Sequence, residues 1–108
     1  MVSEDDRRAG FEKFMEGVNR LLADDNFREV LLELEAEGEE ALGLLEPDPA
    51  AFLRHRGVPI PEDFRFSVEE RSQARQKGQR TTVCYCLRIC WWRWCIEICV
   101  CRTRSVTA

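Results

Sequence analysis

The spacing of the six cysteines is the feature that most limits what this chain can fold into. All six lie within residues 84–101, in the pattern C-x-C-x3-C-x4-C-x3-C-x-C, which reads the same from either end. When they are paired from the outside inward, the residue numbers of every pair have the same sum, 185. A constant sum is the condition for residues that face each other in one antiparallel hairpin. The spacing therefore predicts three disulfide rungs in such a hairpin: Cys84–Cys101, Cys86–Cys99 and Cys90–Cys95.

The position between the second and third cysteine pairs fits the same register. Arg88 and Glu97 also have residue numbers that sum to 185, which predicts an opposite-charge pair across the strands. Disulfides suit the closer, non-hydrogen-bonded class of facing residues, and this class leaves Trp92 and Arg93 as a two-residue turn. Neither residue favours the positive φ of a tight turn. We expect either a strained turn or a looser loop over residues 91–94.

The opposite face of the predicted hairpin is apolar along its whole length, because strand side chains alternate between faces. We interpret it as a surface for a membrane or a protein partner, or for self-association. This predicted surface, which includes Trp92 of the turn, consists of Tyr85, Leu87, Ile89, Trp91, Trp92, Trp94, Ile96, Ile98 and Val100. A membrane-spanning helix is excluded here because Arg88, Arg93 and Glu97 are each costly in the middle of a bilayer.

Charge divides the chain into two opposed parts. Residues 1–70 carry 19 acidic and 8 basic residues, whereas residues 71–108 carry 8 basic residues and Glu97 alone. This division suggests that the acidic part masks or carries the basic part, although each part could also simply solvate itself. The cationic residues that we expect to attract anionic lipid are Arg80, Arg88, Arg93, Arg102 and Arg104.

The acidic part is predicted to be mostly helical. From Gly10 to about Leu45 apolar residues recur at intervals of three and four, which favours two helices, the second capped by Asp24 or Asp25. A further short helix is indicated by Asp48 as N-cap, followed by proline at the first helical position and Gly57 as a C-terminal stop.

One short strand is expected after these helices. Phe64, Phe66 and Val68 alternate with polar residues, so this strand either pairs with the hairpin or offers its edge to a partner. The predicted fold class is α+β. We divide the chain into an acidic helical domain (1–70), a basic exposed linker open to proteolysis (71–82), the hairpin (83–102) and a tail (103–108).

The helical part carries a recognisable order of motifs. Asp25-Asn26-Phe27-Arg28 enters a helix, Asp48-Pro49-Ala50-Ala51-Phe52-Leu53 follows, and then Gly57-Val58-Pro59-Ile60-Pro61-Glu62-Asp63 and a strand ending in Glu69. Over about residues 10–70 this order resembles the nitrile hydratase-like leader peptides of bacterial ribosomally made natural products. The resemblance implies a recognition segment for maturation or export machinery, to which we assign Phe64, Phe66 and Val68, followed by a variable core peptide. The Cys-x-x-Cys-Ser-Cys metal motif of nitrile hydratase itself has no match in this chain, so no metal or catalytic residue is carried over. No double-glycine cleavage site precedes the hairpin.

The hairpin has a resemblance of its own. Cys84-Tyr85-Cys86 and Cys99-Val100-Cys101-Arg102 resemble protegrin and, more loosely, tachyplesins and theta-defensins over about twenty residues. This similarity implies an antimicrobial hairpin that binds anionic membranes. The hairpin is less cationic and more apolar than those peptides, which weakens the expectation of strong lysis.

These observations predict a precursor of a disulfide-rich hairpin peptide. Residues 1–10 lack the apolar stretch of a signal peptide, so we expect synthesis in the cytoplasm, where thiols stay reduced, and a mature peptide that is secreted. The alternatives are an uncleaved interaction module that uses the apolar face and a cytosolic metal-thiolate protein. We expect no enzyme, because the single histidine, His55, has no cysteine or serine motif nearby, and we expect no cofactor and no nucleic-acid partner.

Overall fold

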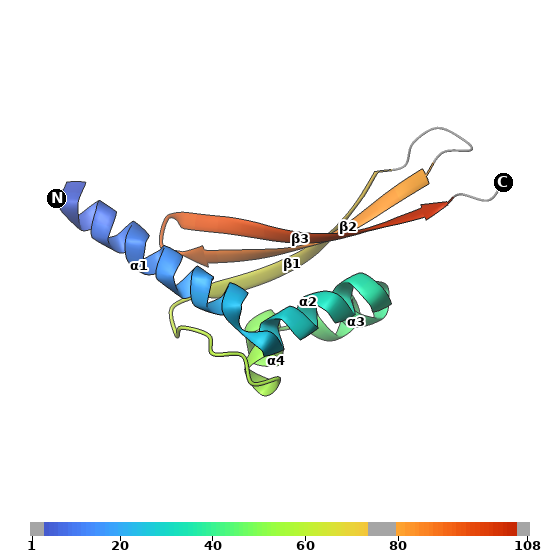
Figure 1. The fold of residues 1–108 in the computed structure, drawn as a ribbon, viewed down its shortest axis with the longest axis horizontal. Coiled ribbons are helices and arrows are strands. Elements are labelled where there is room, and N and C mark those ends of the chain that lie inside the picture. Colours follow the sequence, from blue (N-terminus) through green and yellow to red (C-terminus); the bar gives the residue numbers. More distant parts are fainter. Residues whose placement is uncertain (1–3, 74–79, 106–108) are drawn as a thin grey trace.

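A computed structural model of the chain describes residues 4–73 and 80–105. In these residues four helices come first and a three-stranded antiparallel sheet follows, with its strands in the order β1-β2-β3 (Figure 1). The elements are α1 (Glu4–Ala23), α2 (Asp25–Glu37), α3 (Glu39–Leu45), α4 (Pro49–His55), β1 (Arg65–Gln73), β2 (Arg80–Trp91) and β3 (Trp94–Ser105). The α+β fold class and the C-terminal hairpin with three laddered disulfides are confirmed.

Side-chain caps begin α2 and α4. The Asp24 carboxylate accepts a hydrogen bond from the Phe27 amide at 2.9 Å, and the Asp48 carboxylate accepts one from the Ala51 amide at 3.1 Å. Each bond satisfies an amide that has no partner within its own helix. After α4 the chain turns at Gly57, whose φ of 83° suits glycine. The predicted caps and the predicted stop are therefore confirmed.

Gly38 divides the second predicted helix in two. Its φ of 59° ends α2, and α3 begins at the next residue. A Cβ atom at this position would also lie 2.8 Å from the Tyr85 hydroxyl oxygen. Glycine is thus required here both by the backbone conformation and by the close approach of the sheet.

The strand after the helices pairs with the hairpin, which confirms the first of the two predicted alternatives. Nine residue pairs join β1 to β2, from Arg65 opposite Cys90 to Gln73 opposite Thr82. The predicted linker and tail boundaries were wrong, because residues 71–73, 80–82 and 103–105 belong to strands. Backbone hydrogen bonds extend the strands through polar residues, and these residues have no apolar alternation from which a strand could be predicted. Residues 74–79 and 106–108 lie outside the described residues.

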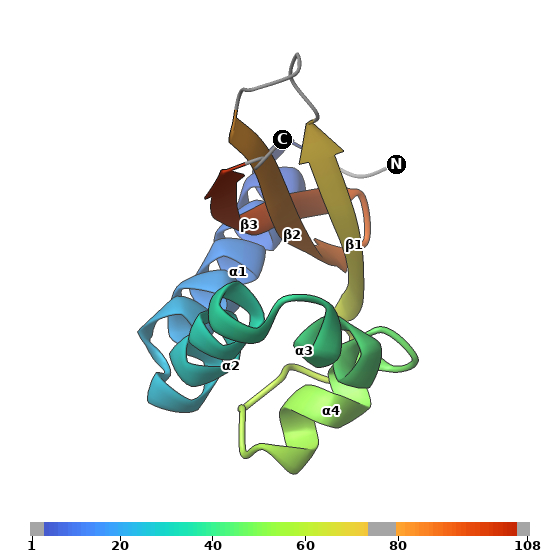
Figure 2. The same ribbon diagram turned by 90° about the vertical axis from the view of Figure 1, so that its right-hand side faces the viewer.

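The hydrophobic core lies between the helices and one face of the sheet, and Figure 2 shows the helices gathered on that side. It crosses the predicted boundary between the acidic part and the hairpin. The buried residues include Phe14, Val18, Leu21, Phe27, Val30, Leu34, Leu45, Leu53, Val58 and Phe64 from the first part, and Tyr85, Leu87 and Ile89 from the hairpin. None of the described helices is both long enough and apolar enough to cross a bilayer.

Two glycines let α1 approach the aromatic side chains of the sheet layer. A Cβ atom at Gly10 would lie 2.7 Å from the Trp94 ring, and one at Gly17 would lie 2.5 Å from the Phe64 ring. The Phe64 ring is itself held between Phe14 and Trp91, with centroid distances of 5.6 and 6.3 Å. It therefore has little room to move away from an added methyl group.

We predict opposite effects for two glycine-to-alanine changes in helices. Gly43→Ala in α3 meets no atom within 4 Å, so it should raise the free energy of unfolding by up to about 1 kcal/mol through helix propensity. Gly17→Ala should lower it by about 1–3 kcal/mol, because overpacking against Phe64 outweighs the same propensity gain. Urea unfolding followed by far-ultraviolet circular dichroism measures both. Equal stabilisation by the two changes would contradict the close packing of α1.

Candidate functional site

The cystine ladder joins β2 to β3 at the three predicted pairs. The Cα–Cα distances are 4.0 Å for Cys84–Cys101 and 4.1 Å for both Cys86–Cys99 and Cys90–Cys95, and all six residues are direct partners in the strand register. These short separations belong to the non-hydrogen-bonded class of facing residues, as the sequence predicts. Because the disulfides alternate with the buried residues of β2, they occupy the face of the sheet opposite the helices.

The hairpin closes with the two-residue turn that was the first of the two expected conformations. Trp92 has a φ of 56°, and no other non-glycine residue in the described part of the chain has a positive φ. A positive φ at the first turn position alone is the pattern of a type II′ turn, which usually places glycine there. The Trp92 ring stacks on Trp91 and Trp94, at centroid distances of 5.5 and 6.5 Å.

The predicted Arg88–Glu97 ion pair needs a correction. The two residues do face each other, but the Glu97 carboxylate binds Arg71 of β1, at 2.8 Å from Nη1 to Oε2 and 2.8 Å from Nη2 to Oε1. Arg71 also binds Glu69 on its own strand. The long Arg71 side chain reaches diagonally across the sheet from an edge strand that the hairpin register alone does not place. The bond from Arg71 lowers the pKa of Glu97, with a smaller Coulombic contribution from Arg88.

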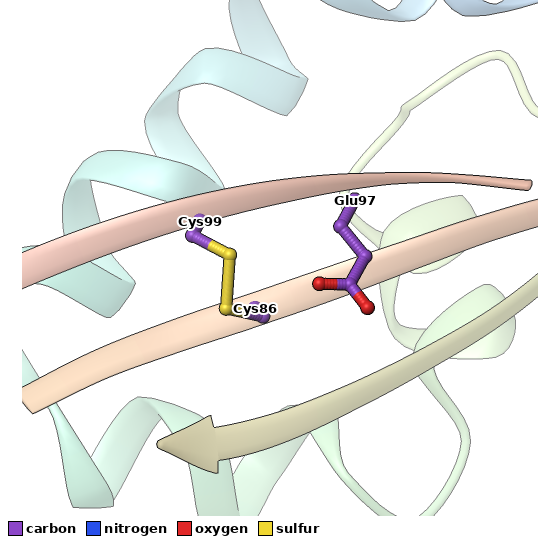
Figure 3. Close-up of side chains that lie close together, drawn as sticks. All are labelled: Cys86, Glu97 and Cys99. Carbon is purple, nitrogen blue, oxygen red and sulfur yellow. A yellow bond between two sulfur atoms is a disulfide. The ribbon is translucent and has the colours of Figure 1, made fainter. Parts of the chain in front are cut away.

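The Arg71–Glu97 bridge spans the middle disulfide. Arg71 lies opposite Cys84, and Glu97 lies opposite Arg88, so a line between them crosses β2 at Cys86. Cys86 is only 2% exposed, although it lies on the face away from the helices. Figure 3 shows the Cys86–Cys99 disulfide beside the Glu97 carboxylate.

These three side chains also form the one group of potential metal ligands found among the described residues. The ligand atoms of Cys86, Cys99 and Glu97 lie within 4.8 Å of one another. Both sulfurs are joined in a disulfide, and thiolates, not disulfide sulfurs, are the form that binds metal. Metal binding here would therefore first require reduction.

The apolar face of the hairpin lies against the chain's own helices. Tyr85, Leu87 and Ile89 are 3%, 1% and 0% exposed. Five further residues of the predicted face are partly buried against the same core, namely Trp91, Trp94, Ile96, Ile98 and Val100. Only Trp92, at 68%, is largely exposed. In the intact chain, the face predicted to meet a membrane or a partner is thus part of the core.

An aromatic cluster fixes the turn end of the hairpin to α1. Phe11 and Phe14 of α1 lie 6.2 and 6.5 Å from Trp94, measured between ring centroids, and Trp94 stacks on Trp91 at 5.7 Å. Arg65 of β1 adds a polar contact, since its Nη2 donates to the Trp92 carbonyl oxygen at 3.1 Å. This contact could not be predicted from the sequence alone, because it depends on the pairing of β1 with β2.

The predicted cationic residues whose side chains the structure describes do not form one patch. Arg88 and Arg93 are exposed, on the central strand and in the turn. Arg102 is exposed too, but its Nη1 donates to the Ala36 carbonyl oxygen at 2.8 Å, in the last turn of α2. A cation at this end of a helix is favourable because the helix dipole is negative there. The side chains of Arg80 and Arg104 lie outside the described part of the structure.

The three residues assigned to leader recognition lie on the inner face of β1 and just before it. Phe64 is buried, and Phe66 and Val68 are partly buried against the core. Their alternation is therefore accounted for by packing within the chain. The single histidine, His55, which was not expected to be catalytic, is exposed in the last turn of α4.

A cleft of about 330 Å³ lies beside α1, with Phe64 and Trp91 among its lining residues. Charged residues of both signs surround it, namely Lys13, Glu16, Arg20, Glu62 and Asp63. This mixture gives the cleft no single preference for an anionic or a cationic ligand, and His55 does not line it.

No protein-family model, no curated protein and no solved structure matches this chain. The resemblances of residues 10–70 to nitrile hydratase-like leaders and of the hairpin to protegrin therefore stay predictions.

We predict that acid weakens the fold partly through Glu97. Its folded-state pKa is below the ordinary value of 4.5, so ionised Glu97 stabilises the fold above that value, and this contribution is lost as pH falls through the folded pKa. Glu97→Gln should therefore reduce the drop in the urea midpoint between about pH 7 and about pH 3. Tryptophan fluorescence reports the midpoint.

Two arginine variants identify the partner of Glu97. Arg71→Met should reduce the acid-dependent drop in the same way as Glu97→Gln, since it removes the bonded guanidinium. Arg88→Met should have a smaller effect, because Arg88 acts only through Coulombic attraction. A larger effect of Arg88→Met than of Arg71→Met would favour the pair expected from the sequence.

Proposed function

We propose that this chain is the precursor of a secreted, disulfide-rich β-hairpin peptide that acts on membranes after its helical part is removed. The observation that carries the proposal is the arrangement of the hairpin's two faces. All three disulfides lie on one face, and the other is a continuous apolar and aromatic surface covered by the helices of residues 4–55. A hairpin with this surface is suited to insert at a lipid interface once it is uncovered.

Masking within the intact chain supports this role. The aromatic residues with the strongest preference for a membrane interface, Trp91 and Trp94, pack against core residues that include Phe14 and Phe64. Charge supports it as well. Glu37, Glu39 and Glu40 line a shallow pocket next to Val83 and Tyr85 of β2. Carboxylates beside the hairpin oppose its approach to anionic lipid.

A cut within residues 74–79 would not by itself release the hairpin. After such a cut, the nine residue pairs between β1 and β2 would still hold the two parts together. The shared core would hold them too. Freeing the peptide therefore involves unfolding or degradation of the helical part, or competition from a membrane for the apolar face.

The alternative of an uncleaved interaction module has less support. It requires the apolar face to meet a partner, and in the intact chain Leu87 and Ile89 on that face are fully buried. The metal-thiolate alternative also has less support. It requires reduced thiolates, whereas all six cysteines are paired in disulfides. A precursor role is consistent with both the covered apolar face and the oxidised cysteines of the intact chain.

Mass spectrometry of the producing culture tests the proposal. We expect a secreted fragment that begins near residue 80 and includes the whole hairpin. It should be about 6 Da lighter than the reduced sequence, since each of three disulfides removes two hydrogens. Reduction and alkylation should then add six labels. Recovery of only the intact 108-residue chain, or of a chain that retains a metal ion, would contradict a precursor role.

The membrane activity is tested separately with the purified fragment. We expect vesicles containing phosphatidylglycerol to shift its tryptophan emission to shorter wavelength and to leak their contents. The intact chain, whose apolar face is covered, should need a several-fold higher concentration for the same leakage. Neutral phosphatidylcholine vesicles are the control for charge. Equal leakage by intact chain and fragment would contradict masking, and no leakage by the fragment would contradict membrane action.

A further inference from the structure

The two faces of the hairpin differ in how far other molecules can reach them. The apolar face is clamped by the helices and carries the buried residues Tyr85, Leu87 and Ile89. The cystine face is open to solvent on β3, where Cys95, Cys99 and Cys101 are all exposed. Contacts that fix the strand register and sulfurs that must react with an oxidant are thus kept on opposite sides of one sheet.

We infer that the helical part and β1 act as an intramolecular template that sets the register of the reduced hairpin, so that the three laddered disulfides form in preference to other pairings. This inference deepens the proposed function and rests on it only in treating residues 1–70 as a leader. The six cysteines allow 15 connectivities, and the sulfur chemistry alone does not choose among them.

The contacts that would fix the register involve no sulfur atom. The ladder between β1 and β2 runs over nine residue pairs and so determines which residues of β2 face the helices. A slip of one residue would turn Leu87 and Ile89 outward and bring cysteines into the core. Two close contacts strengthen the choice, since Gly10 receives the Trp94 ring and Gly38 receives the Tyr85 hydroxyl. These contacts reach both β2 and β3, so they align the two strands with each other.

Every rung pairs an exposed cysteine of β3 with a less exposed cysteine of β2. The β2 members are Cys86, which is buried, and Cys84 and Cys90, which are half-buried. This asymmetry suits stepwise thiol–disulfide exchange. The exposed β3 thiolate attacks a disulfide oxidant and releases one thiol. The facing β2 thiolate then attacks the β3 sulfur of this mixed disulfide and releases the second thiol. Two electrons and two protons pass from the cysteine pair to the oxidant.

Oxidative refolding of the full chain tests the template. The reduced, denatured chain is refolded with oxidised and reduced glutathione, and the disulfide isomers are quantified by peptide mapping. We expect the ladder isomer to dominate. In the double variant Gly10→Leu/Gly17→Leu, which pushes α1 away from Trp94 and Phe64, its share should fall several-fold, toward the random value of about one in fifteen.

A matched control and a second measurement separate templating from a general loss of folding. Gly43→Leu adds the same side chain to α3 at a position where an added Cβ atom meets no atom within 4 Å, so the ladder isomer should stay dominant. A chain with all six cysteines changed to serine should retain amide-exchange protection at Leu87 and Ile89, because the template acts without disulfides. Loss of that protection would overturn the inference, and so would an unchanged isomer distribution in the Gly10→Leu/Gly17→Leu chain.

These experiments use the intact chain and involve no release step. Failure of the template would leave the search for a secreted fragment unaffected. Failure to find that fragment would leave the refolding result unaffected.

Discussion

The packing of β2 against the helices is the interaction on which the rest of the structure depends. A two-stranded hairpin has no core of its own and is at best marginally stable in water. Here the central strand gains β1 on one side and β3 on the other, and it presents Tyr85, Leu87 and Ile89 to the helices. Burial of each such side chain contributes roughly 1.5–3 kcal/mol. The hairpin is therefore held by noncovalent contacts as well as by its disulfides, and the helices in turn need its apolar face to complete their core.

Strand alternation gives the two kinds of stabilisation separate places and a common register. Disulfides and the Arg71–Glu97 bridge lie on one face, while the apolar contacts lie on the other. A register shift of one residue would exchange the faces. The disulfides and the apolar contacts therefore both disfavour the same register errors. The exposed bridge stabilises little by itself. Its place over Cys86 ties the β1 edge to β3 across the middle disulfide, so all three strands are joined on both faces.

The sequence predicted those features that depend on local chemistry or on simple register arithmetic. The disulfide pairs follow from the cysteine spacing, and the caps at Asp24 and Asp48 follow from residues adjacent to each helix. The partner of Glu97 could not be predicted, because Arg71 reaches it only through the pairing of β1 with β2, which no periodicity in the sequence fixes. The contacts at Gly10 and Gly17 depend on how α1 crosses the sheet. The polar strand ends could not be predicted from the side-chain pattern, because backbone hydrogen bonds extend them.

The same apolar face has two uses in the proposed function, and they place opposite demands on the sequence. As part of the core, it must be apolar enough to hold four helices, which favours the isoleucines and tryptophans found there. As a membrane surface, it gains from added cations, but a cation on that face would be buried unpaired in the intact chain at high cost. Among the described side chains, positive charge therefore lies outside the covered part of that face. Arg88 is on the cystine face and Arg93 is in the turn, while Arg102, on the apolar side near the end of β3, is exposed and donates to the Ala36 carbonyl oxygen. In the proposed function, packing within the intact chain thus accounts for a hairpin that is less cationic than protegrin.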